Sequence, residues 1–244
     1  MTAVRFGGDG RSLASAATDG SLNLWDLARP GPRATSLRGH DLSIAVLRFS
    51  PEADPGYLLS WGQGEPARLW RLPDPGADPL VLRAPVGPLI MGMAVSADGR
   101  WIASSSNGDD RLVLWSTQDL RAPAHMLAMP GFARSIAFSP DGRWIAAKSQ
   151  DQGRISLWSL HDLARPPLVM VQEGWSDDRT LRFSPDNRWL ASGTSGGQRS
   201  SLDLWDVSAD TPALEPRHRC RPNGIAARQE EGFESSRLAT TASF

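Results

Sequence analysis

The sequence predicts an all-β fold in which one four-stranded antiparallel sheet is repeated along the chain. Two features of the 244 residues carry this prediction. A short apolar run that ends in tryptophan recurs about every 45 residues, and a turn motif precedes each tryptophan by about twenty residues. A fixed period of this length is typical of repeat architectures, in which each repeat buries its apolar face against the next one.

The tryptophan runs have the composition of a buried strand. Each places leucine, isoleucine or valine beside the tryptophan, as in Leu112-Val113-Leu114-Trp115. The five recurring tryptophans are Trp25, Trp70, Trp115, Trp158 and Trp205. Because they recur at one position of the repeat, we expect them to pack between neighbouring sheets.

The turn motif joins the first two strands of each repeat. Residues 138–144 give its fullest form, Phe-Ser-Pro-Asp-Gly-Arg-Trp, with variants at 6–11, 95–101 and 183–189 and a stretched form after residue 49. Proline presets φ, and glycine or asparagine accepts a positive φ, so the motif favours a tight turn. Apolar alternation on both sides predicts strands. A polar loop, the tryptophan strand, a proline-containing link and a fourth strand complete the unit.

This unit resembles the WD40 repeat, a four-stranded blade of about 40–45 residues. Trp25-Asp26 and Trp205-Asp206 supply the Trp-Asp pair of that family, and Gly39-His40 supplies the Gly-His that opens its repeats. The resemblance covers residues 2–216 and implies a WD40-like β-propeller. We place its blades at about 2–38, 39–83, 84–128, 129–171 and 172–217.

Residues 218–244 are expected to form an irregular tail with a partial sixth blade, because residues 237–243 resemble the second strand of the first blade. The expected fold is therefore about five blades plus a partial sixth, whereas closed WD40 rings most often have seven. Three explanations stay open: a fragment of a longer protein, a small or irregular ring, and a ring closed by a second chain. Open blade edges favour self-association.

Members of the family stabilise a blade with hydrogen bonds among a histidine, a serine or threonine, an aspartate and the tryptophan. In the second blade His40, Ser60 and Trp70 match three of these, but Gln63 or Glu65 stands where aspartate is expected. We therefore expect incomplete networks and blades held together mainly by apolar packing.

The composition argues against several classes of protein. A net charge of −1 does not favour nucleic acid or an anionic membrane as a partner, and no apolar run is long enough for a membrane-spanning helix. Cys220 is the only cysteine, and the first residues do not resemble a signal peptide, so the expected setting is a reducing cytoplasm. Lys148 is the only lysine, which points to a GC-rich bacterial genome.

No catalytic, cofactor-binding or metal-binding residues are predicted. Residues 193–197 match a Gly-x-Ser-x-Gly pattern, but they fall in a hairpin loop rather than at a strand-to-helix elbow. The four histidines fall in different blades without the spacing of metal ligands. We therefore expect no enzyme activity, no cofactor and no metal site.

Aromatic residues outside the repeat mark the expected contact surface, with local packing of the links as the alternative. Phe132 and Trp175 lie in links between blades, with Arg134 and Arg179 beside them. In WD40 proteins such links open on the face where partners often bind, and aromatic residues and arginine dominate interface energetics. The expected function is a non-catalytic protein–protein interaction scaffold, as the sensor or docking portion of a larger bacterial signalling protein. The alternatives are a small-ligand-binding or enzymatic propeller that uses its central channel and, more weakly, a periplasmic propeller.

Overall fold

The computed structural model describes residues 1–220, apart from residues 29–30, 32–33, 52–55, 63, 73, 84–89, 121, 150–152, 173–179, 195–200, 211 and 213. These residues form five four-stranded antiparallel sheets, each with its strands in chain order, which we number as blades one to five. This arrangement confirms the predicted fold class. The partial sixth blade expected after residue 220 lies outside the described residues.

The strands of the first three blades are as follows. Blade one contains β1 (Ala3–Phe6), β2 (Ser12–Ala16), β3 (Leu22–Asp26) and β4 (Ala34–Leu37). Blade two contains β5 (Ile44–Phe49), β6 (Tyr57–Gly62), β7 (Ala67–Arg71) and β8 (Leu80–Leu82). Blade three contains β9 (Ile90–Val95), β10 (Trp101–Ser106), β11 (Arg111–Ser116) and β12 (His125–Ala128).

The last two blades repeat the same meander. Blade four contains β13 (Ala133–Phe138), β14 (Trp144–Ser149), β15 (Arg154–Ser159) and β16 (Leu168–Val171). Blade five contains β17 (Leu181–Phe183), β18 (Trp189–Thr194), β19 (Ser201–Asp206) and β20 (His218–Cys220).

The fifth blade ends later than the sequence predicts. Strand β20 pairs with β19 through His218 and Arg219, residues that the sequence analysis assigned to the irregular tail beyond residue 217. This strand was missed because it is polar and lies at the outer edge of its sheet. Arg219 forms a two-pronged ion pair with Asp203, at 2.9 and 3.1 Å, so an ionic contact replaces the apolar pattern expected of a strand.

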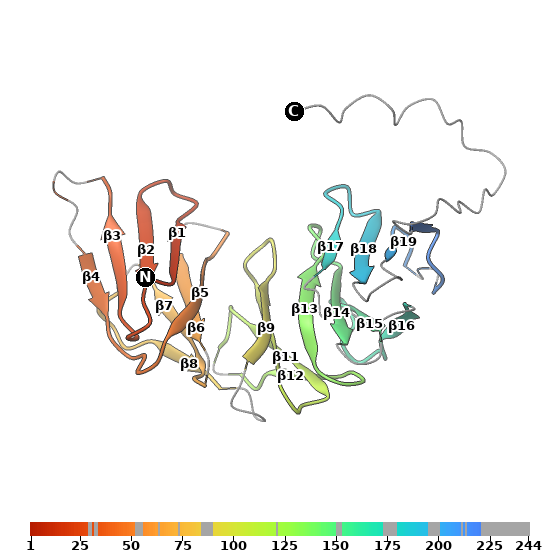
Figure 1. Cartoon of the computed structure of the whole chain (residues 1–244), viewed down its shortest axis with the longest axis horizontal. Helices are drawn as coiled ribbons and strands as arrows, with labels where there is room; N and C mark the ends of the chain where they lie inside the picture. Colours follow the sequence, from red (N-terminus) through yellow and green to blue (C-terminus); the bar gives the residue numbers. More distant parts are fainter. Residues whose placement is uncertain are drawn as a thin grey trace.

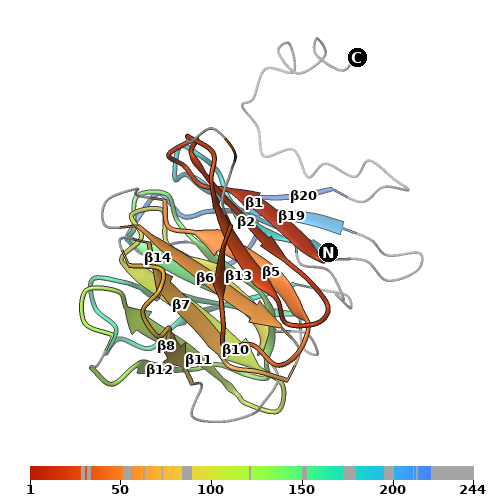
Figure 2. The same cartoon turned by 90° about the vertical axis from the view of Figure 1, so that its left-hand side faces the viewer.

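The five blades follow one another along an arc that is open between blade one and blade five (Figure 1). The first strand of each blade lies on the inner side of the arc, and the fourth lies on its outer side. From the side of blade one, β1 and β2 lie in front of the other sheets (Figure 2). The inner face of the arc is thus lined by β1, β5, β9, β13 and β17.

The turn motif holds its hairpin through one repeated set of hydrogen bonds. In blade four Asp141 Oδ1 accepts from the Ser139 hydroxyl at 2.6 Å and from the Arg143 backbone N–H at 3.1 Å. Ser139 Oγ in turn accepts from the Trp144 backbone N–H at 2.9 Å. Gly142 follows the aspartate with φ of 71°, which explains the glycine at this point of the motif. Blades three and five repeat these bonds.

Apolar cores lie between successive blades, and each contains the tryptophan of the later blade. Trp70 packs against blade one, Trp115 against blade two, Trp158 against blade three and Trp205 against blade four. These four side chains are buried. Trp25 is only half-buried, because it points away from the face of blade one that packs on blade two.

A buried polar contact joins blades four and five. Lys148 is 3% exposed, and its ammonium group donates to Ser192 Oγ at 2.8 Å and to the Gly193 carbonyl oxygen. Gln172 exchanges two hydrogen bonds with Ser192, donating to the Ser192 carbonyl oxygen and accepting from its hydroxyl. The only lysine of the chain therefore links blade four to blade five through buried hydrogen bonds. The amino-acid composition of the chain does not indicate this role.

Candidate functional site

Two of the four predicted contact residues, Phe132 and Arg134, lie at the junction of blades three and four. Both are half-buried, on either side of the first residue of β13. The link before them is anchored at both ends. The Met129 backbone N–H donates to the Asp110 carbonyl oxygen at 2.9 Å, and the Ser105 hydroxyl donates to the Ala133 carbonyl oxygen. The backbone between Phe132 and Arg134 is therefore tied to blade three as well as to blade four.

The other two predicted contact residues, Trp175 and Arg179, lie outside the described residues. Their part in a contact surface stays a prediction.

Blade two contains a complete hydrogen-bond network, and the prediction of incomplete networks is wrong for this blade. Trp70 Nε1 donates to Ser60 Oγ at 2.8 Å, and Ser60 Oγ lies 2.8 Å from His40 Nε2. His40 Nδ1 lies 2.5 Å from Glu65 Oε2, which also accepts from Arg68 Nη1 at 3.0 Å. Glu65 therefore takes the place that aspartate has in the family, because its longer side chain reaches the imidazole.

Glu65 also connects this network to the link between blades one and two. Its second oxygen accepts the backbone N–H groups of Asp41 at 2.7 Å and Leu42 at 3.1 Å. Burial raises the pKa of Glu65, but the hydrogen bonds from His40 and Asp41 outweigh it and leave that pKa below its ordinary value. Burial lowers the pKa of His40 below its ordinary value, which favours the neutral imidazole. With the proton on Nδ1, the neutral imidazole donates to Glu65 and accepts from the Ser60 hydroxyl, while Arg68 Nη1 lies 2.8 Å from the same Nδ1.

Blade one, by contrast, has only part of this network. Trp25 Nε1 donates to Ser15 Oγ at 2.9 Å, while the Asp19 carboxylate accepts the Ser21 backbone N–H at 3.0 Å. For this blade the predicted incompleteness is confirmed.

Three arginines that the sequence analysis did not single out lie on the inner face of the arc. Arg5, Arg48 and Arg182 belong to the first strands of blades one, two and five, and all three are exposed. Burial lowers the pKa of Arg48 below its ordinary value, and the like charges of Arg5 and Arg182 lower it further. The charges of Arg5 and Arg182 therefore both act on Arg48. The signal in the sequence is an Arg-Phe pair that recurs at 5–6, 48–49 and 182–183.

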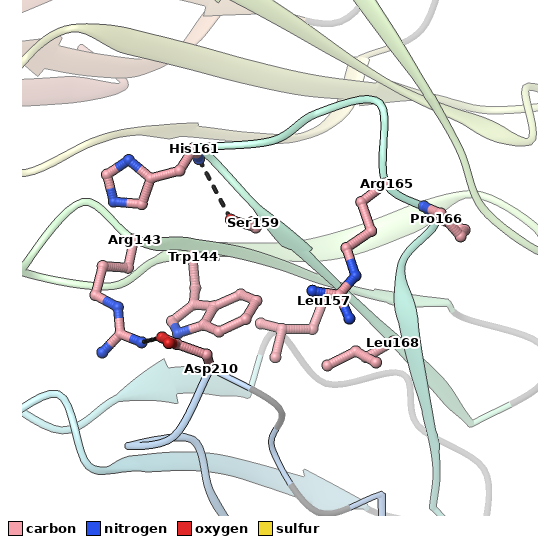
Figure 3. Close-up of a pocket in the computed structure, with 9 residues that line it drawn as sticks. All are labelled: Arg143, Trp144, Leu157, Ser159, His161, Arg165, Pro166, Leu168 and Asp210. Atoms are coloured by element: carbon pink, nitrogen blue, oxygen red, sulfur yellow. Dashed lines mark hydrogen bonds and ion pairs between the residues drawn. The ribbon is translucent and has the colours of Figure 1, made fainter.

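A pocket lies between the second, third and fourth strands of blade four and Asp210, which follows β19 in blade five (Figure 3). Arg143 spans it, pairing with Asp210 at 2.5 Å while its guanidinium lies over the Trp144 ring. His161 and Ser159 are also at this pocket, but their hydrogen bond joins the backbone N–H of His161 to the serine hydroxyl. That bond does not orient the imidazole as a base toward the serine, so the pair lacks the arrangement of a nucleophile and its base.

The described residues hold no group of three or more His, Cys, Asp or Glu side chains placed to bind one metal ion. The Gly-x-Ser-x-Gly pattern is described only at Gly193 and Thr194, which end strand β18. Among the residues that the structure describes, none forms a helix long and apolar enough to cross a bilayer.

Comparison with known families gives one match. The family described as "WD domain, G-beta repeat" matches residues 1–26, 80–116, 124–159 and 168–206, which is more than half of the chain.

Comparison with individual proteins gives a weaker picture. A curated relative, the nuclear distribution protein nudF of Aspergillus niger, is 26% identical over 120 residues. The match covers 49% of this chain and 26% of the fungal protein, so the chain spans about a quarter of the length of this relative. Among solved structures, the β-propeller domain of Cps50 (Swd1) from Myceliophteria thermophila has a TM-score of 0.64 and 23% identity. That likeness covers 89% of this chain and 71% of the other, and it shows the fold alone.

Proposed function

Because this chain belongs to the WD40-repeat family, whose propellers generally mediate protein–protein interaction, we propose that it is a non-catalytic interaction scaffold. The observation that supports the proposal is the position of Phe132 and Arg134 on either side of Ala133, whose carbonyl oxygen accepts a hydrogen bond from Ser105 of blade three. An aromatic side chain beside an arginine on a rigid base is the usual composition of an interface hot spot. We propose further that Trp175 and Arg179 extend this contact surface.

The finer context is also part of the proposal. We place the scaffold in a reducing cytoplasm, in keeping with its single cysteine, as the sensor or docking portion of a larger bacterial signalling protein. Its composition, with one lysine among 26 basic residues, supports a GC-rich source.

A small-ligand-binding or enzymatic propeller is the second candidate. The observation that favours it is that Arg5, Arg48 and Arg182 occupy equivalent positions in the inner strands of three blades. A ligand of this kind would bind the purified chain in the absence of any other protein.

The scaffold proposal is tested by comparing how much of a protein partner is retained by the wild-type chain and by the Phe132→Ala and Arg134→Ala variants. Truncation of a hot-spot residue costs about 2 kcal/mol or more, so each variant is expected to retain less than a tenth of the partner that the wild-type chain retains. The measurement is quantitative co-purification from a lysate of the source organism, followed by binding of the isolated partner.

The matched control is Val171→Ala, an exposed apolar residue on the outer strand of blade four, which should leave retention unchanged. If both link variants and the control retain the partner equally, the proposed surface is wrong.

We also propose that the chain associates with a second copy through the uncovered faces of its end blades. Phe6 is 68% exposed on the face of blade one that carries Trp25, and Leu202 is 45% exposed on the face of blade five turned away from blade four. Phe6→Ser is expected to weaken this association about tenfold, since it removes one large apolar contact. Sedimentation velocity over a range of concentrations measures the change against the 26.4 kDa monomer. A wild-type chain that stays monomeric at the highest concentration would rule the proposal out.

A further inference from the structure

The inner face of the arc carries charge of one sign. The five strands that line it read AVRF, IAVLRF, IMGMAV, ARSIAF and LRF. Four arginines are their only charged residues, and none of these strands contains aspartate or glutamate. The chain as a whole has 27 acidic residues and a net charge of −1, so this separation of charge is local to the inner strands.

Three of the four arginines occupy the same position of their strands. Arg5, Arg48 and Arg182 each lie directly before the phenylalanine that leads into the first turn of the blade. They stand opposite Ala14, Leu59 and Ala191 in the respective second strands. At the matching position β9 and β13 carry Ala94 and Ala137. One level of the inner face therefore combines three guanidinium groups with two of the smallest side chains.

The three guanidinium groups lack an anionic partner among the described residues. Arg5 Nη1 donates to the Val4 carbonyl oxygen at 2.7 Å, and Arg182 Nη1 donates to the Leu181 carbonyl oxygen at 3.1 Å. No described carboxylate forms an ion pair with any of the three. Like charges gathered without a counter-charge repel, and an oxyanion placed among them would relieve that repulsion.

We infer that Arg5, Arg48 and Arg182 form a binding site on the inner face for an acidic segment of a protein partner. The inference rests on the proposed interaction function and names the chemistry of the partner that this face takes. Guanidinium groups pair with carboxylates or phosphates through two parallel hydrogen bonds, so three of them match two or three acidic groups on one extended segment.

Charge distinguishes this partner from a nucleic acid. A nucleic acid binds along a continuous basic track, and its affinity comes from many phosphate contacts. Here the cluster is confined to one level of the inner face, and the remainder of the chain has a net charge of −4. A short acidic segment is attracted to the cluster. A long polyanion would also extend over the negatively charged remainder of the chain, which would repel it.

The test uses the full chain and a fluorescein-labelled hexaglutamate peptide, with binding followed by fluorescence anisotropy. Arg48→Gln is expected to weaken binding about tenfold, since it removes a charge-assisted pair from the centre of the cluster. Arg48→Lys keeps the charge but not the two-pronged geometry, and is expected to lose about threefold. The matched control is Arg154→Gln, an exposed arginine at the start of β15, which should bind as the wild type does. Binding should weaken as salt is raised.

Folding is measured alongside. Because partial burial and the like charges of Arg5 and Arg182 both disfavour the charged form of Arg48, which has no ion pair among the described residues, Arg48→Gln is expected to melt at the wild-type temperature or above it. A loss of peptide binding together with a lower melting temperature points to damage of the fold and overturns the assignment for Arg48. The variants Arg5→Gln and Arg182→Gln, measured in the same way, then decide whether the site exists.

Three competition outcomes complete the test. If inorganic pyrophosphate binds through the same arginines and hexaglutamate does not, the ligand of the site is a small free oxyanion, and the proposal of an acidic protein segment is wrong. Single-stranded DNA that binds more tightly than the peptide would overturn the choice of a protein partner. If neither peptide nor pyrophosphate binds, the inner-face site is wrong, while the scaffold at Phe132 and Arg134 is judged separately by its own co-purification.

Discussion

Glu65→Ala is expected to lower the free energy of unfolding by about 3 kcal/mol, because it removes the centre of a buried network and leaves its partners without an acceptor. Glu65 is 7% exposed and accepts hydrogen bonds from His40, Arg68 and the backbone of the link that follows blade one. Urea denaturation followed by circular dichroism measures the loss. Glu215→Ala, at an exposed position, should change the free energy by less than about 0.5 kcal/mol.

The dependence of the free energy of unfolding on pH distinguishes the electrostatic contribution of this network from the contribution of apolar packing. The folded pKa of His40 lies below its ordinary value of 6.5, so its contribution is complete above that pH and is lost as the pH falls below it. The folded pKa of Glu65 lies below 4.5, so its contribution is lost as the pH falls through the folded value. In a plot of the free energy of unfolding against pH, Glu65→Ala should therefore reduce the loss of stability on the acid limb, below about pH 4.5. An unchanged acid limb would show that Glu65 carries no electrostatic part of the stability.

Trp205→Ala is expected to cost about 3–5 kcal/mol, the range for removal of a fully buried large aromatic side chain. Trp205 is fully buried in the core that joins blade four to blade five, together with Leu190 and Met170. The substitution leaves a cavity between two sheets that cannot collapse without shifting a blade. The free energy of unfolding, again from urea denaturation, measures the effect.

The repeat supplies its own control for this prediction. Trp25 occupies the same position in blade one but is half-buried, so Trp25→Ala should cost about 1–2 kcal/mol. Trp205→Phe should lower the free energy of unfolding less than Trp205→Ala does, because a phenyl ring still fills part of the site. In addition, Trp205 Nε1 donates to no atom among the described residues, so no hydrogen bond is lost. Equal costs at Trp25 and Trp205 would contradict the view that each blade buries its tryptophan against the preceding one.

The hydrogen-bond network of blade two could be read only in part from the sequence. The order of His40, Ser60 and Trp70 along the repeat predicts three members of the network, but it does not identify Glu65 as the fourth. Chain order does not tell how far a side chain reaches, and the extra methylene of glutamate closes the distance to the imidazole. The same limit applies to Lys148, whose contact with Ser192 joins residues in different blades.

Local structure could be predicted from the residues alone: an all-β chain of four-stranded antiparallel sheets, with tight turns at its aspartate-glycine pairs. These features follow from backbone preferences and from the alternation of apolar residues, and both act over a few neighbouring positions. The side chains that meet between blades could not be predicted, because they depend on how the sheets pack in three dimensions. Arg5, Arg48 and Arg182 lie far apart along the chain, on first strands that the curvature of the arc brings to one inner side (Figure 1), and the charges of Arg5 and Arg182 lower the pKa of Arg48. A residue-level pattern contains no such curvature, since it results from how whole sheets pack on one another.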